Sequence, residues 1–414
     1  MNAPLKNVAL QAYQDAFERL EPDFPEVQRA ARRQQLERFL QLDFPTKRQE
    51  RWRYTDLGAL AAARFALAID DGTVPELPRL VDTTRMVFVN GRHRANLSDS
   101  EIDHGTLAPE ATNTDAIVAI NAALSADGLN LHLDRGQKLL QVLHLISFRQ
   151  AGSAANMSHL RHRIVLDDNA EAEVILHQIG DGDYFSTDVL HVTLAPGARL
   201  KLHRLQEESP TSTQLMRIDA QLARGSALEV FSADFGGGLI RQDVNVALEG
   251  EGAEVKLSAL CAADGRAHVD SHTRIEHRAP HCRSRELFRG IVAGRAHAVF
   301  DGLIVVALGA VKTNSDQQVA SLLLSPKAEI NAKPELEIYN DDVRCNHGAT
   351  VGQLDEAALF YLRSRGLDRL TAKSLLTQAF AHIALEIIDF APLREFVEQR
   401  LDVRLRAMHN ETGK

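Results

Sequence analysis

The residues with the clearest capacity for chemistry lie in one short segment, Arg344-Cys345-Asn346-His347-Gly348. Cys345 and His347 are two positions apart, so in an extended strand the thiol and the imidazole would point to the same side. An imidazole and the charge of Arg344 would stabilise a thiolate, the form of cysteine that holds sulfur or iron. One cysteine and one histidine do not complete a metal site, which takes about four ligands. The segment is therefore either half of a shared site or a strand end with a structural role, and the residues alone leave both open.

Signatures of nucleotide-binding and hydrolytic sites are missing from the sequence. No GxxxxGK[ST] loop occurs, and GEGAEV at 250–255 lacks the third glycine of a dinucleotide-binding turn, so we interpret it as a turn before a strand. Neither HExxH nor GxSxG is present. Two close pairs of histidines, His159 with His162 and His277 with His281, are predicted to lie in turns. These patterns give no basis for predicting an enzyme.

Composition limits the partners and the compartment. The chain has 414 residues, 44% of them apolar, and a net charge of −9, so it can bury a core and has no overall attraction to nucleic acid or an anionic membrane. Its three cysteines, Cys261, Cys282 and Cys345, form no CxxC pair, which favours a reducing compartment over a disulfide framework. No signal-peptide pattern and no membrane-spanning apolar run is visible, so we expect a cytoplasmic protein.

The middle of the chain repeats one template of two alternating strands around a small turn. The turn residues Asn169, Gly197, Gly225 and Gly252 are 27 or 28 positions apart, and continuing the count reaches Pro280 and then Gly309. A repeat of this length with strands and no helix predicts a β-solenoid, whose coils bury a core only against their neighbours. An antiparallel β-sandwich, which also has regularly spaced turns, remains the alternative.

Helical periodicity marks both ends of the chain. Residues 1–80 are predicted to form a helical region followed by a linker at 70–80, residues 81–350 the solenoid, and residues 351–414 a second helical region. Thr371 is a candidate N-cap for the helix that carries the apolar stripe Leu375, Ala379, Phe380 and Ile383. We expect the face with Leu375, Ala379 and Ile383 to pack inward, against the end of the solenoid, which would otherwise expose unpaired strand edges.

Several stretches resemble the SufB/SufD family of iron–sulfur cluster assembly proteins, and together they cover nearly the whole chain. They are FPTKRQERWRYTDL at 44–57, VFVNGRHRANLS at 87–98, HVDSHTRIEHRAPHCRSRELFRGIV at 268–292, VFDGLIVV at 299–306 and, most closely, residues 321–367. The N-terminal helices and the lack of clustered cysteines resemble the SufD-like rather than the SufB-like members.

The resemblance implies a right-handed parallel β-helix flanked by helices, and a non-catalytic scaffold subunit. It implies a SufB-like partner bound through the β-helix and a SufC-like ATPase bound through the C-terminal helices, at Leu375, Ala379, Phe380 and Ile383. His347 first, and Cys345 second, would contribute to a site shared with the SufB-like partner, where a transient iron–sulfur cluster forms. No cofactor would be bound stably by this chain alone, and the isolated chain would form a homodimer.

Two other functions stay open beside this one. A free-standing homodimeric β-helix module would use the same surface for a second copy. A β-helix enzyme acting on a polysaccharide would need acids clustered in a groove on one face.

Overall fold

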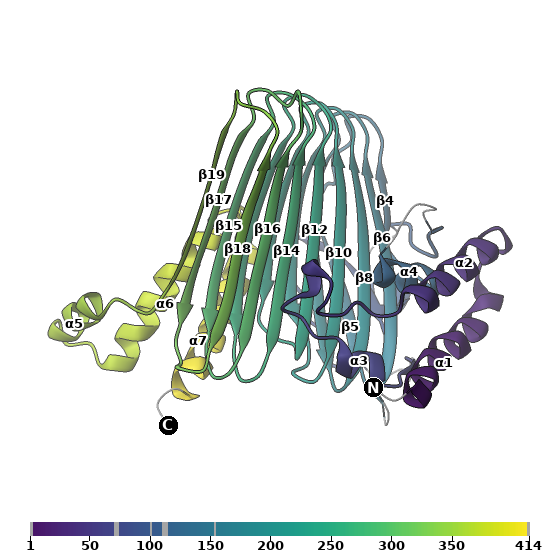
Figure 1. The fold of residues 1–414 in the computed structure, drawn as a ribbon, viewed down its shortest axis with the longest axis horizontal. Coiled ribbons are helices and arrows are strands. Elements are labelled where there is room, and N and C mark those ends of the chain that lie inside the picture. The colour runs from purple at the N-terminus through teal and green to yellow at the C-terminus, as the bar shows by residue number, and fades with distance from the viewer. Residues whose placement is uncertain (1–2, 70–73, 100–101, 110–114, 153–154, 412–414) are drawn as a thin grey trace.

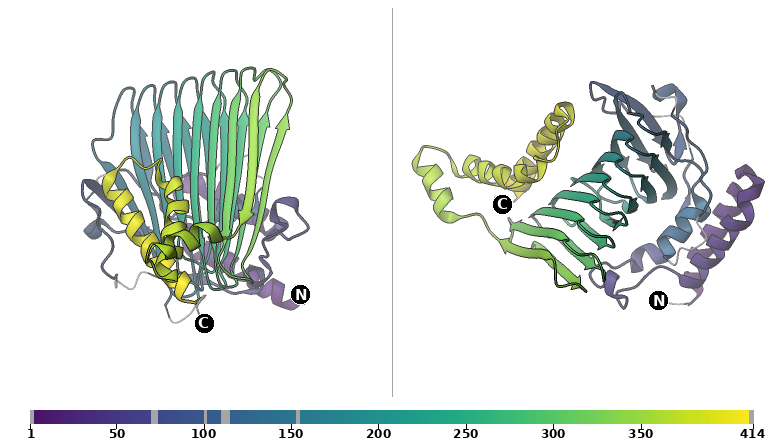
Figure 2. Two further views of the ribbon diagram at one scale, coloured as in Figure 1. Left: turned by 90° about the vertical axis from the view of Figure 1, so that its left-hand side faces the viewer. Right: turned by 90° about the horizontal axis from the view of Figure 1, so that it is seen from above.

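The computed structural model describes residues 3–69, 74–99, 102–109, 115–152 and 155–411. Its centre is a flattened solenoid of long strands, with the N-terminal helices on one side and the C-terminal helices on the other (Figures 1 and 2). Residues 70–73 of the predicted linker lie outside the described residues.

Successive strands alternate between two sheets, so that each coil contributes one strand to each. In the described chain, the first sheet has the order β1-β6-β8-β10-β12-β14-β16-β18, with β4 also paired to β6, and the second has the order β19-β17-β15-β13-β11-β9-β7-β5-β2-β3. The strands are β1 Ala66–Leu67, β2 Thr83–Val89, β3 Arg92–His93, β4 Asn130–Leu133, β5 Val142–Gln150, β6 Asn156–Leu166, β7 Glu171–Asp181, β8 Tyr184–Leu194, β9 Arg199–Glu207, β10 Thr213–Leu222, β11 Ala227–Asp234, β12 Leu239–Leu248, β13 Glu254–Ala263, β14 His268–His277, β15 Arg283–Val292, β16 His297–Val306, β17 Asn314–Leu323, β18 Glu329–Ile338 and β19 Arg344–Gly352.

Parallel pairing decides between the two predicted architectures. Each long strand pairs in parallel with the strand two places away in the sequence, as in β10 with β12 and β15 with β17, and the short β2–β3 hairpin is antiparallel. The prediction of a parallel β-solenoid is confirmed, and the antiparallel sandwich is wrong.

The repeat markers lie in one column of turns. Asn169, Gly197, Gly225 and Gly252 all have positive φ, and the N–H of each donates to a carbonyl of the next coil, such as Gly197 N to Arg224 O at 3.0 Å. Left-handed backbone favours glycine and asparagine, which explains why the repeat is visible in the sequence.

In the last two coils, the turn residue that continues this column is not the one that the regular spacing predicts. The column continues at His281 and Lys312, with φ of 59° and 58°, rather than at Pro280 and Gly309, which lie in the same turns. Proline cannot take a positive φ and has no N–H to donate, so Pro280 supplies the carbonyl that accepts from Gly252 instead.

Three of the four histidines predicted in turns lie in strands, and only His281 is in a turn. His159 and His162 are in β6 and His277 is in β14, and all three are buried. Burial lowers the pKa of His159 to about 3 and that of His162 to about 4, so both rings are neutral and pack as polar aromatics. Their partners, such as Thr187 Oγ1 at 2.7 Å from His159 Nδ1, come from neighbouring coils, which a local sequence pattern does not reveal.

The N-terminal helices cover the outer face of the first sheet. They are α1 Ala3–Leu20, α2 Glu26–Leu42, α3 Gly58–Ala62 and α4 Ala116–Leu124, with short 3-10 turns at Glu21–Asp23, Glu50–Trp52 and Ala95–Leu97. An aromatic cluster joins them to the sheet, with Phe44 packing on Phe185 of β8 at a ring separation of 6.0 Å.

At the first coil, Ile102 packs against the interior core, and His104 pairs with Leu129, so this end of the solenoid is covered.

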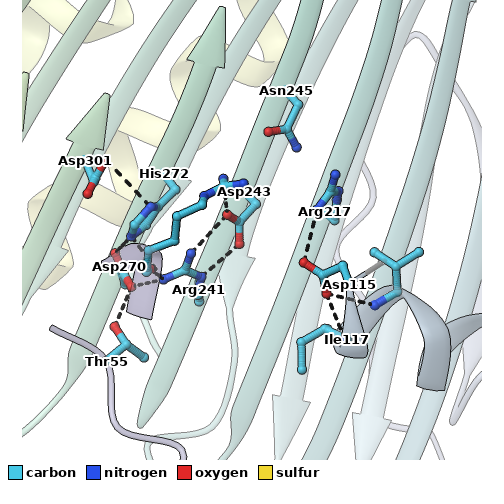
Figure 3. A network of polar contacts seen from close by, with 12 residues as sticks. Thr55, Asp115, Ile117, Arg217, Arg241, Asp243, Asn245, Asp270, His272 and Asp301 are labelled. Carbon is cyan, nitrogen blue, oxygen red and sulfur yellow. Dashed lines mark hydrogen bonds and ion pairs between the residues drawn. The ribbon is translucent and has the colours of Figure 1, made fainter. Parts of the chain in front are cut away.

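Residues 44–57, which we call the strap, cross the outer face of the first sheet. Arg241 of β12 lies over the Trp52 ring at 3.9 Å and donates to the Arg51 carbonyl at 2.9 Å. Thr55 donates to the buried Asp270 carboxylate, which also accepts from Arg241 (Figure 3). The residues of this sequence motif therefore fasten the chain to β12 and β14.

Replacing Thr55 by valine should lower the free energy of unfolding by about 1–3 kcal/mol, since a buried carboxylate loses a donor while side-chain shape is kept. Urea unfolding of the full chain measures this. Thr193→Val, on the exposed face of β8, is the matched control and should change stability by less than about 0.5 kcal/mol. Equal effects in the two variants would mean that the strap is not fastened through Thr55.

Two of the C-terminal helices, α6 and α7, lie on the outer face of the second sheet and not on the end of the solenoid, and α5 projects away from the sheet (Figure 2). The C-terminal helices are α5 Glu356–Ser364, α6 Arg369–Leu385 and α7 Ala391–Glu411. Ala381, Ala384 and Leu385 of α6 form one apolar cluster with residues of β9 to β15. The expectation that these helices cover the end of the solenoid is therefore wrong, because the apolar outer face of the second sheet offers the larger surface to bury.

The N-cap of α6 also differs from the prediction. Asp368, not Thr371, caps the helix, and its carboxylate accepts from the N–H groups of Leu370 and Thr371. A carboxylate at this place satisfies free N–H groups and favours the positive end of the helix dipole.

Candidate functional site

The last coil of the solenoid ends without a cover. In the part of the chain that the structure describes, β18 pairs only with β16, and β19 pairs only with β17. The other edge of each strand is open, at the end of the solenoid farthest from the N-terminal helices (Figure 1). An open strand edge carries unpaired N–H and C=O groups, which can pair with another strand.

Cys345 and His347 lie on this last strand and on its inward side. Cys345 is in register with Ser315 of β17, and His347 with Gln317, and both of these β17 residues are fully buried in the interior. Cys345 is half-buried and packs against the interior core, whereas His347 is exposed at the open end. The two side chains therefore share one side of β19, as an extended segment requires.

Alternation along the strand separates Arg344 from this pair. Arg344 is exposed and its side chain belongs to the opposite face of β19 from Cys345. Burial raises the pKa of the Cys345 thiol, and a hydrogen bond with the Ser315 backbone acts in the opposite direction. The predicted help from the Arg344 charge is thus weaker than the sequence suggested, and support for the sulfur comes from β17.

On the inward side of β19, the predicted ligands are one thiol and one imidazole. Among the described residues, the one group of three side chains able to hold a metal ion is elsewhere, at His132, Asp134 and Asp167, near the first coils. Cys345 and His347 fit iron as two ligands of a larger set, since thiolate and imidazole both suit that metal. A complete site needs further donors at the open edge.

Ser315, Gln317, Ser284 and Glu286, which lie behind Cys345 and His347, are polar residues that sequence reasoning missed. They occupy the same inward positions one and two coils earlier. The spacing of the repeat could have found them, had the template been extended to the last coils.

The residues predicted to meet an ATPase lie mostly on the outer surface of α6. Leu375 is 43% exposed and Ile383 41% exposed, and Ala379 is exposed as well. Phe380 is half-buried and packs under the Arg289 guanidinium, with 5.5 Å from that carbon to the ring centre. The prediction that Leu375, Ala379 and Ile383 face inward is wrong, since small residues such as Ala381 and Ala384 take that face and let the helix approach the sheet.

Further exposed apolar residues extend this surface. Phe360 and Tyr361 of α5 and Leu370 of α6 are exposed, in addition to Leu375 and Ile383. We call these five residues the helical apolar surface. An exposed apolar patch of large side chains is typical of a protein contact.

Comparison with known proteins identifies the class to which this fold and site belong. The family model described as "SUF system FeS cluster assembly, SufBD core domain" matches residues 148–380, and the "SufBD protein N-terminal region" matches residues 5–93. The chain belongs to the SufB/SufD family of iron–sulfur cluster assembly proteins.

Within this family the chain is SufD-like. It is 33% identical over 389 residues to the iron–sulfur cluster assembly protein SufD of Escherichia coli, covering 90% of this chain and 92% of that protein. It is 28% identical over 403 residues to an iron–sulfur cluster assembly SufBD family protein of Synechocystis, with 88% of each chain covered. It is also 28% identical over 394 residues to the chloroplastic protein ABCI7 of Arabidopsis thaliana, covering 88% of this chain and 82% of that one.

None of the helices in the described parts of the chain is both long enough and apolar enough to span a membrane.

Proposed function

We propose that this protein is a non-catalytic scaffold subunit that supplies half of a cluster-assembly site to a complex with a SufB-like protein and a SufC-like ATPase. The observation that carries the proposal is the pairing of an incomplete ligand set, His347 and Cys345, with an uncovered solenoid end. A partner that docks on this end brings its own donors next to both side chains. The iron–sulfur cluster is then a transient product held between two chains, and neither chain needs to bind it alone.

The open edges of β18 and β19 are the proposed contact for the SufB-like partner. Hydrogen bonding between parallel strands uses alternate residues, and Arg344 N donates to the carbonyl of Thr313, the residue before β17. The backbone groups of Cys345, His347 and Ala349 consequently point to the open edge. Exposed apolar side chains at this end, among them Tyr339 and Val351, add surface to bury.

The helical apolar surface, together with the exposed Ala379 of α6, is the proposed contact for the ATPase. Its residues belong to α5 and α6, and all five side chains are exposed. Phe380 would act there by holding α6 to the sheet rather than by direct contact. In this arrangement the N-terminal region 1–80 covers the first sheet, the β-helix 81–350 carries the shared site, and region 351–414 carries the ATPase, all in the cytoplasm.

Two observations bear on the other candidate functions. A second copy of this chain can pair with the same open edges, which supports a homodimer of the isolated protein through the surface meant for the SufB-like partner. A polysaccharide enzyme needs free acids in a groove. Here Asp301 and Glu335 of the first sheet, with Glu50 of the strap, surround the Lys333 ammonium instead. That arrangement favours a structural role for these acids.

Co-expression with a SufB-like protein and a SufC-like ATPase tests the proposal. We expect a complex of the three chains that assembles a cluster, visible in its absorbance spectrum, and no ATP hydrolysis by this chain alone. ATP turnover by the isolated chain, or failure to bind both partners, would refute the proposal.

Ala349→Pro should block pairing at the open edge without disturbing the β17–β19 ladder. The Ala349 N–H faces outward, so proline removes no hydrogen bond within the solenoid but cannot donate to a partner strand. Light scattering after size exclusion should show a monomer, and co-purification with the SufB-like partner should fall by at least about tenfold. Ala349→Val, which keeps the N–H, is the control and should behave as the wild type.

A further inference from the structure

We infer that two files of buried polar side chains inside the last coils position the ligand atoms of Cys345 and His347. Ser284 and Ser315 stand behind Cys345, and Glu286 and Gln317 behind His347 (hereafter the serine file and the amide file). The inference rests on the proposed function, in which these two side chains are ligands. It assigns positioning roles to residues that do not themselves touch the iron.

Strand register builds both files. Ser284 of β15 pairs with Ser315 of β17, which pairs with Cys345 of β19. Glu286 pairs with Gln317, which pairs with His347, in the next inward row. In-register side chains of neighbouring parallel strands stack at a spacing of about 4.8 Å, so each file leads directly to one ligand.

The serine file is a directed chain of hydrogen bonds. The Ser284 hydroxyl donates to Ser315 Oγ at 2.8 Å, so the 2.9 Å contact between His277 Nε2 and Ser284 Oγ must have the imidazole as donor. Burial lowers the pKa of His277 to about 4, and its ring is therefore neutral with the proton on Nε2. All three residues are buried. Since Ser315 accepts from Ser284, its own hydrogen is left to donate outward, where Cys345 is the next residue in the file.

In the amide file the hydrogen bonds run the other way: the residue next to the ligand position donates inward, toward the preceding coil. Gln317 Nε2 donates to Glu286 Oε2 at 2.6 Å. Gln317 Oε1 is buried and has no hydrogen-bond partner among the described residues. A buried carbonyl without a hydrogen-bond donor lowers the stability of the fold, so a donor at this position would be favourable. The His347 ring, one coil further on, has an N–H to give.

A glycine makes room for this amide. A Cβ added at Gly302 of β16 would come within 2.3 Å of Gln317 Nε2, so only glycine at that position lets the Gln317 side chain lie across the interior. The opposite sheet therefore leaves the space that the amide occupies.

The serine file offers a donor to the cysteine sulfur, and the amide file offers an acceptor to the histidine ring; these are the groups that the two ligands need. A hydroxyl that donates to a metal-bound sulfur supports its negative charge, and a carbonyl that accepts from one ring nitrogen leaves the other free for the metal. Ligating histidines nearly always give their second N–H to such an acceptor. The buried side chains of the last coils thus hold the sulfur and the imidazole in the orientation in which a partner can complete the site.

The serine file is tested by the alkylation rate of Cys345 in the purified full-length chain. Iodoacetamide at one fixed pH, read by mass spectrometry, reports on Cys345, because Cys261 and Cys282 are buried. Ser315→Ala should slow the reaction about threefold to tenfold, through loss of a hydrogen bond to the reacting sulfur anion. Ser315→Thr, which keeps the hydroxyl, should restore the rate. Ser321→Ala, an inward serine elsewhere on β17, is the matched control and should leave the rate unchanged.

The amide file is tested with Co²⁺ as the probe of the shared site in the complex with the SufB-like partner. Gln317→Met should weaken Co²⁺ binding about 10-fold to 100-fold with co-purification unchanged, the usual cost of losing such a supporting group. If the wild-type complex binds no Co²⁺, the shared site itself is wrong, and the alkylation rates still decide the serine file. Wild-type alkylation in Ser315→Ala, together with wild-type Co²⁺ affinity in Gln317→Met, would overturn the inference.

Discussion

Replacing His347 by alanine is expected to abolish cluster assembly while leaving the fold and the complex intact. His347 is exposed at the open end of the solenoid, so its loss should change the free energy of unfolding by less than about 0.5 kcal/mol. Assembly should fall by more than about 100-fold, since even groups that only support a ligand are worth about 10–100-fold in metal affinity. The measurement is the rate at which the three-chain complex gains cluster absorbance when supplied with iron and a sulfur source.

Asn346→Ala is the matched control for this variant. Asn346 is the neighbour of His347 on the same exposed strand, but its side chain belongs to the other face of β19. It should assemble clusters at the wild-type rate. Cys345→Ser should impair assembly less than His347→Ala, since Cys345 is the second of the two proposed ligands. Wild-type assembly in His347→Ala would refute the role given to the imidazole.

Replacing Arg149 by methionine should lower the free energy of unfolding by about 3–5 kcal/mol, the largest effect on stability that we expect from one substitution. The guanidinium lies inside the solenoid, bound to the Asp188 carboxylate at 2.5 and 2.7 Å and to Glu208 at 2.8 Å. Burial opposes its charge, but the two carboxylates outweigh this and raise the pKa of Arg149. Methionine keeps much of the volume and leaves two acids buried without a counter-charge.

Urea unfolding of Arg149→Met tests this prediction, with Arg283→Met as the control in which an exposed arginine is replaced. Arg283 forms an exposed pair with Glu254 at 3.4 Å, and an exposed pair contributes less than about 1 kcal/mol. Equal losses in the two variants would mean that the interior charges are not coupled as their distances indicate.

The sequence predicted those features that a few neighbouring residues determine. Asn169 and Gly225 revealed the repeat because a left-handed turn restricts the residue type at that very position. Cys345 and His347 were assigned to one side of a strand because alternation needs only two residues and an extended backbone.

Features set by distant coils could not be predicted in this way. His159 is buried because Thr187, in the next coil of the first sheet, offers it a hydrogen bond. The apolar stripe of α6 showed which residues are apolar but not which of them are covered. Close approach to the sheet selects small side chains such as Ala381, and larger ones such as Ile383 are left outside.

The uncovered end of the solenoid also limits the size of the assembly. The first coil is closed by the segment that includes Ile102, whereas the last coil presents the free edges of β18 and β19. A stack of coils with two free ends could add subunits without limit, as a fibre does. Because only one end presents free edges, strand pairing at that end would join two chains and would leave no further edge for a third.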